Sequence, residues 1–161
     1  MNNKNAENSI NECNKDLSGI EYILKNHSSL SSLSRYLTLY ALIKVTGTLE
    51  FSYKNIIADY YISYSSQIKE YLTNTIKESS SNPSYDNINH LLKSFDENKS
   101  DLFKKYTSNK DRNKSSLKSL NHLRNQFAHG YSIDTSFSDI KQYFIDSLDI
   151  IYILDSILTP N

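Results

Sequence analysis

Apolar residues recur every three or four positions along most of the chain, the spacing that places them on one face of an α-helix. The clearest stripe predicts a first helix over residues 7–25. Its apolar members are Ile10, Cys13, Leu17, Ile20 and Leu24. Strand-like alternation is weak, and glycine and proline, which interrupt helices, number only three and two. The pattern therefore predicts an all-α fold.

The same spacing continues through the middle of the chain. A region from residue 31 to residue 64, rich in Leu, Ile and Tyr, predicts a long central helix that Gly47 interrupts without ending. His27-Ser28-Ser29 is expected to separate it from the first helix. Shorter helical pieces are expected at residues 67–77, 86–95 and 99–106, with a loop at residues 79–83. Together these elements predict an up-down helical bundle with additional short helices.

Two further helices are expected near the C-terminus. Residues 114–128 are amphipathic, and the apolar face predicted to point into the bundle consists of Leu117, Leu120, Leu123 and Phe127. Gly130 stands where a helix C-cap glycine belongs. Asp134 or Ser136 then starts the last helix, which is apolar nearly all round over residues 150–154. That helix is therefore expected to be largely buried, either in the bundle or at a subunit interface.

The length of 161 residues suffices for one domain with its own core. We expect a single domain over residues 1–161, with about residues 1–6 as a flexible N-terminus. The single cysteine, Cys13, excludes an internal disulfide and is expected to be a small helix residue rather than a nucleophile. No run approaches ~18 apolar residues, so no membrane span is expected, and the first residues have no apolar signal core. These features predict a reduced, cytoplasmic protein.

Charge is unevenly distributed, although eighteen basic and eighteen acidic residues cancel overall. Residues 103–129 carry a net charge of +6 with histidine neutral, and residues 130–161 carry a net charge of −4. A basic segment can collect phosphate groups. It can also be the solvated helix face of a lysine-rich protein, and this is the interpretation that the segment taken alone favours.

The residues with the most chemical potential stand at the end of the helix predicted over residues 114–128. Arg124 is one of only three arginines, and its planar fork can bind a phosphate through two parallel hydrogen bonds. His129 can exchange a proton near neutral pH. Asn121, Asn125 and His129 lie four residues apart, so they share a face that is expected to point outward. The group predicts chemistry at a phosphodiester, although a histidine here can also simply contact the carbonyls that end its helix.

This segment resembles the HEPN family. Arg124 and His129 fit its R-x4-H motif, and the string Arg-Asn-x-x-Ala-His is the form common among ribonuclease-type members. Tyr131 extends the motif to R-x4-H-x-Y, the form of HEPN toxins paired with nucleotidyltransferase-type antitoxins. The stretch Gly47-Thr48-Leu49-Glu50, followed by a tyrosine-rich helix, resembles the second helix of the RiboL-PSP type. The resemblance covers most of the chain in architecture but few positions in specific residues.

The resemblance implies a HEPN-like bundle that acts as an RNA endonuclease without metal or cofactor. His129 is then the general acid or base, Arg124 binds the phosphate, and Asn125 holds the histidine or contacts the phosphate. Because one helix supplies one copy of each group, the resemblance also implies a homodimer in which two motifs face one cleft. Tyr131 is then an RNA contact or the hydroxyl that an antitoxin nucleotidyltransferase modifies. The implied setting is a toxin–antitoxin or phage-defence system.

Several alternatives stay open. Glu50 is expected to be partly buried, and a buried carboxylate needs a partner. Arg124 is one candidate, and Lys54 or solvent at the edge of the bundle is the equally good alternative. A non-catalytic HEPN module that binds a nucleotide or a partner protein remains the second interpretation of the motif. A plain helical interaction protein is the third, and it predicts that Arg124 and His129 lie far from any dimer axis.

Two other groups of residues are expected to be structural. His90 and His122 have no carboxylate or cysteine at a ligand spacing, so no metal site is predicted. A run of tyrosines could stack on bases, but such a stripe is more often bundle core or dimer interface. Its members are Tyr53, Tyr60, Tyr61 and Tyr64.

Overall fold

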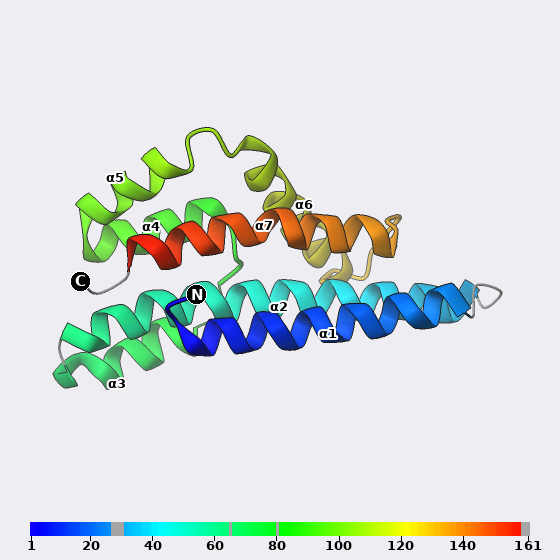
Figure 1. The fold of residues 1–161 in the computed structure, drawn as a ribbon, viewed down its shortest axis with the longest axis horizontal. Coiled ribbons are helices and arrows are strands. Elements are labelled where there is room, and N and C mark those ends of the chain that lie inside the picture. Colours follow the sequence, from blue (N-terminus) through cyan, green and yellow to red (C-terminus); the bar gives the residue numbers. More distant parts are fainter. Residues whose placement is uncertain (27–30, 65, 80, 159–161) are drawn as a thin grey trace.

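An antiparallel pair of long helices forms the base of the molecule (Figure 1). The computed structural model describes residues 1–26, 31–64, 66–79 and 81–158. Helix α1 spans Lys4–Asn26 and α2 spans Ser31–Tyr64, close to the predicted limits. The predicted break at His27-Ser28-Ser29 lies outside the described residues. The stripe of α1 packs as expected, since Ile10, Cys13, Leu17 and Ile20 are all buried.

The N-terminal residues are tied to the other end of the chain. Asn3 caps α1, because its side-chain oxygen accepts a hydrogen bond from the Ala6 N–H at 2.9 Å. The backbone N–H groups of Asn2 and Asn3 donate to the Asp155 carboxylate at 2.6 and 3.0 Å. These bonds join the start of α1 to the last turns of α7, Phe137–Ile157. The expected flexibility of residues 1–6 stays a prediction.

Helix α7 lies along α2 and is the second large contributor to the core (Figure 1). It begins with a capping box, in which Ser136 accepts from the Asp139 N–H while Asp139 accepts from the Ser136 N–H. This arrangement selects Ser136 over Asp134 as the start of the helix. The predicted burial of α7 is confirmed on its inner side. The buried apolar residues are Ile140, Phe144, Leu148, Ile150, Ile151, Leu154 and Ile157.

Shorter elements complete the bundle. After α2 the chain continues through a 3-10 turn at Ser66–Ile68, helix α3 at Lys69–Leu72 and a π-helical turn at Thr73–Lys77. Helices α4, Tyr85–Phe95, and α5, Glu97–Tyr106, pack against each other, and α5 also contacts α7 (Figure 1). Helix α6, Asp111–Ala128, packs against α7 and also contacts α2 and α4. The described residues contain helices and no strand, which confirms the all-α prediction.

The apolar stripe of α6 is only partly confirmed. Leu117 and Leu120 are fully buried and Leu123 is partly buried, but Phe127 is 37% exposed. Burial therefore decreases toward the C-terminal end of α6, and its last turn stands out from the bundle. The prediction that Phe127 faces the core is wrong for this reason.

Candidate functional site

The end of α6 is shaped by Gly130. This glycine has a φ of +77°, a left-handed conformation that other residues adopt only with strain. Its N–H donates to the Phe127 carbonyl at 3.0 Å, and the Tyr131 N–H donates to the Gln126 carbonyl at 2.9 Å. This pair of bonds is a Schellman motif, which ends a helix and turns the chain sharply away. The turn confirms the predicted cap and leaves His129 at the projecting end of the helix.

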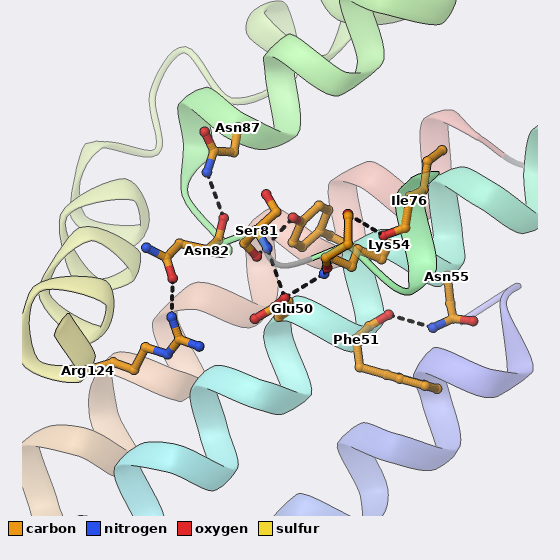
Figure 2. Close-up of polar contacts among 11 residues, drawn as sticks. Glu50, Phe51, Lys54, Asn55, Ile76, Ser81, Asn82, Asn87 and Arg124 are labelled. Atoms are coloured by element: carbon orange, nitrogen blue, oxygen red, sulfur yellow. Dashed lines mark hydrogen bonds and ion pairs between the residues drawn. The ribbon is translucent and has the colours of Figure 1, made fainter. Parts of the chain in front are cut away.

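The structure places Arg124, Asn125 and His129 on the last two turns of α6. Arg124 is partly buried, and its Nη1 donates to Asn82 Oδ1 at 2.5 Å (Figure 2). Asn125 is exposed, and its Oδ1 accepts from Asn82 Nδ2 at 3.4 Å. The His129 side chain is exposed and has no hydrogen bond or ion pair with any described residue. Asn125 therefore contacts the loop before α4 and not the imidazole.

Asn121 departs from its predicted outward position. It is 7% exposed, and its Nδ2 donates to the Pro83 carbonyl at 3.0 Å. The loop that precedes α4 passes over this part of α6, so a face that the helix alone would leave open is covered. Asn121, Arg124 and Asn125 thus hold the segment at Asn82 and Pro83 from one side.

Helix α2 holds the same loop from the other side. Glu50 Oε1 accepts from Lys54 Nζ at 2.5 Å and from the Ser81 N–H at 3.2 Å (Figure 2). Lys54 Nζ also donates to the Ser79 carbonyl. Tyr53 donates to the Ser81 carbonyl at 3.2 Å, and burial raises the pKa of its phenol to about 12. The hydroxyl of Tyr53 therefore stays protonated, as a donor must.

The partner of Glu50 is Lys54 and not Arg124. The side chains of this pair are only 19% and 5% exposed, so partial burial of Glu50 is confirmed. Arg124 forms no ion pair with Glu50 or with another carboxylate of the described residues. Since Lys54 neutralises Glu50, the positive charge of Arg124 is left without a counter-charge in the described part of the chain.

Asn82 was not identified from the sequence. Its side chain joins Arg124 and Asn125, and its carbonyl accepts from Asn87 Nδ2 at 3.0 Å. The Asn-Pro pair predicted only a loop at residues 79–83. A local pattern could not show that the loop meets α6, because the Arg124 contact spans 42 residues of sequence.

Most of the tyrosine run belongs to the structure of the bundle. Tyr53 is buried, Tyr60 and Tyr61 pack edge to face with centroids 5.0 Å apart, and Tyr61 stacks on Phe95 at 4.6 Å. These contacts favour the structural interpretation over base stacking. The Tyr64 side chain lies outside the described residues. Tyr131 differs from the run, because it is 67% exposed immediately after the α6 turn.

Two cations of the basic segment pair with the acidic segment that follows it. Lys110 pairs with Asp149 and Arg112 pairs with Asp146 of α7, each at 3.0 Å. Hydrogen bonds from Gln142 and Ser116 and the Arg112 charge hold the pKa of Asp146 below its usual value despite burial. Part of the charge difference between the two segments is therefore used in ion pairs where α6 meets α7.

Neither a metal cluster nor a membrane helix is found in the described part of the chain. No three His, Cys, Asp or Glu side chains converge there as metal ligands, and His90 and His122 are exposed on different helices. No helix among the described residues is long and apolar enough to cross a membrane. Cys13 is a buried free thiol, and burial raises its pKa.

Comparison with known proteins agrees with this architecture. No curated protein matches the chain. No solved structure matches it. The sequence model of the RiboL-PSP-HEPN family matches residues 4–160, nearly the whole chain and both ends of the helical bundle. The chain therefore belongs to the RiboL-PSP-HEPN family.

Proposed function

We propose that this protein is a HEPN-type endoribonuclease in which Arg124 and His129 act at the scissile phosphate. The observation that supports it most is the pairing of a charged, oriented arginine with an exposed histidine five residues later on one helix end. Members of the family are commonly ribonucleases, and Arg124 and His129 fit the family's R-x4-H motif. Asn82 orients the guanidinium through a neutral amide, so the positive charge remains available to a phosphate.

The proposed reaction uses the nucleophile that RNA itself carries. A base takes the proton of the 2′-hydroxyl, whose oxygen attacks phosphorus, and the bond to the 5′-oxygen breaks as an acid protonates the leaving oxygen. The products are a 2′,3′-cyclic phosphate and a free 5′-hydroxyl. Arg124 stabilises the negative charge that grows on the phosphoryl oxygens. His129 supplies one proton transfer, and Asn125, exposed beside it, can contact the phosphate.

A second copy of the chain completes the proposed site. One helix end offers one histidine, whereas the reaction needs a base and an acid on opposite sides of the phosphate. The His129 imidazole has no partner among the described residues of its own chain. A twofold dimer that brings two α6 ends together supplies both groups.

Tyr131 is the proposed point of regulation in a toxin–antitoxin or phage-defence setting. It is exposed two residues after His129 in the chain, and its backbone is held by the turn at Gly130. A nucleotidyltransferase-type antitoxin could reach this hydroxyl, and a nucleotide attached there would block the motif with added bulk and negative charge. Without modification the same ring can contact RNA.

The decisive test is RNA cleavage by purified protein in EDTA. The wild-type protein is expected to cut RNA and leave cyclic-phosphate ends, which mass spectrometry detects. His129→Ala is expected to lower the cleavage rate at least ~100-fold, the usual contribution of a general acid or base. His122→Ala is the matched control, since His122 is an exposed histidine of the same helix. Equal cleavage by the two variants would remove the assignment.

A non-catalytic module that binds a nucleotide is the alternative. The unpartnered His129 side chain favours it, because nothing in the described chain orients this imidazole for proton transfer. The alternative predicts nucleotide binding that depends on Arg124, with no RNA cleavage under any condition. Titration calorimetry and the cleavage assay on the same sample separate the two functions.

A further inference from the structure

The face of α6 that carries the motif continues toward the start of the helix. Polar residues follow one another along it at spacings of four, three, four and four positions, which keeps them on one side of a helix. They are Lys114, Lys118, Asn121, Asn125 and His129. The side of α6 that presents the candidate site therefore also presents two lysines.

These lysines line a pocket against the first turn of α4. The pocket has a volume of about 300 Å³. Its other lining residues are Ser84, Tyr85, Asp86, Ser115 and Asn121. The N-terminus of α4 adds a partial positive charge, because the first N–H groups of a helix lack partners within it. One of these groups is already used, since the Asn87 N–H donates to Ser84 Oγ at 3.1 Å.

Lys114 and Lys118, like Arg124 nearer the end of the helix, form no ion pair with α7. Lys118 is exposed and forms no ion pair with the described residues. Lys114 Nζ lies 3.7 Å from the exposed carboxylate of Asp111 and 4.9 Å from the centre of the Tyr85 ring. Lys110 and Arg112, in contrast, pair with α7. Both ammonium groups of the pocket are thus placed to meet an external anion.

The pocket also offers hydrogen-bond acceptors. Asn121 is 7% exposed, and its Oδ1 has no hydrogen-bond partner among the described residues, while its Nδ2 is held by Pro83. An unpaired buried acceptor is costly, and a donor from a ligand would relieve that cost once a shift of the Asn121 side chain uncovers this oxygen. The Asp86 carboxylate lines the same space and likewise accepts only. A nucleotide of an RNA strand carries both a phosphate for the lysines and O–H or N–H donors for the acceptors.

We propose that this pocket is a second RNA subsite, which binds a nucleotide of the strand away from the bond that is cut. Lys114 and Lys118 take the phosphate, and Asn121 and Asp86 accept from the ribose or the base. Lys118 and His129 are eleven residues apart on one helix, or about 16 Å along its axis. That length corresponds to several stacked nucleotides at ~3.4 Å each. The proposal rests on the proposed function, because it takes the ligand to be the strand that His129 cleaves.

Binding of single-stranded RNA tests the subsite directly. The full chain carries His129→Ala so that the RNA stays intact, and the RNA is long enough to reach from His129 past Lys118. Adding Lys118→Glu is expected to weaken binding roughly three- to tenfold at low salt and to reduce the salt slope by about one. Lys105→Glu is the matched control, since Lys105 is also exposed and unpaired among the described residues but lies on α5, away from the pocket. Circular dichroism confirms that both variants fold.

The outcomes separate this inference from the proposed function. If Lys118→Glu and Lys105→Glu bind RNA equally, the subsite proposal is wrong. The proposed nuclease function is then still tested separately, by RNA cleavage with His129 intact. If the wild-type chain binds long RNA through Lys118 but never cuts it, the subsite stands and the nuclease proposal fails. If the wild-type chain neither binds nor cuts RNA, the subsite proposal and the nuclease proposal are both wrong.

Discussion

At the residue scale, Arg124 is distinguished by a neutral partner. Arg112, on the same helix, donates to the Asp146 carboxylate, whereas Arg124 donates to the amide oxygen of Asn82. A carboxylate both orients and neutralises a guanidinium, but an amide only orients it. The sequence identified Arg124 as the phosphate-binding candidate, and the structure adds the reason that its charge remains available.

Asn82→Asp tests the importance of this neutral partner. The aspartate keeps an oxygen for Arg124 to contact, but its charge competes with the phosphate. We expect RNA affinity to fall by roughly tenfold, equivalent to ~1.4 kcal/mol, with the free energy of unfolding unchanged or raised. Filter binding and urea denaturation measure the two quantities. Asn109→Asp, at an exposed turn, adds the same charge elsewhere and is expected to change neither.

The partner of Glu50 could not be chosen from the sequence. The sequence predicted a partly buried carboxylate and left its partner open between Arg124 on one side and Lys54 or solvent on the other. Lys54 is favoured by its place one turn later on α2, and its Nζ also satisfies the Ser79 carbonyl. The pair holds the loop that carries Asn82, so Glu50 supports the arginine indirectly and does not contact it.

At the element scale, the helices were predictable because their signals are local. Periodic apolar residues set the body of each helix, and a serine, aspartate or asparagine caps most of the described starts. Gly130 ends α6 by the same kind of local rule. Phe127 was misplaced because local periodicity does not tell how far along its length a helix stays in the bundle.

Gly130→Ala measures what this turn contributes. No heavy atom lies within 4 Å of an added Cβ, so the expected loss in the free energy of unfolding, about 1 kcal/mol, comes from the left-handed backbone alone. Gly19→Ala is the matched control in the middle of α1, where space is also open. It is expected to raise the free energy of unfolding by about 0.5–1 kcal/mol. Chemical denaturation of both variants checks the opposite signs, and a gain in Gly130→Ala would contradict the turn's role.

At the scale of the whole molecule, the basic segment at residues 103–129 and the acidic segment at residues 130–161 partly neutralise each other. The basic segment and the acidic segment meet as α6 and α7, through Lys110–Asp149 and Arg112–Asp146. Part of the charge difference between the two segments is therefore used in ion pairs within one chain. Arg124, Lys114 and Lys118 of α6 form no ion pair with α7, so their charges remain available to a polyanion.

The proposed shared site makes a prediction about mixed dimers. If each cleavage needs His129 from both copies, mixing wild-type and His129→Ala chains and allowing exchange lowers activity with the square of the wild-type fraction. A linear decrease would show that each chain acts alone. Light scattering should first give a mass of twice 18.6 kDa for either sample.

The sequence by itself determined the approximate helices, the C-cap at Gly130 and the identity of the motif, because each depends on residues within a few positions of one another. It also identified the family resemblance that the comparison confirms. Only the tertiary structure decided the partners: Asn82 for Arg124, Lys54 for Glu50 and Pro83 for Asn121. Two of these contacts join segments about forty residues apart in the chain, and burial of one element by another is a property of packing. The site therefore combines a locally encoded helix end with a loop that packing alone brings to it.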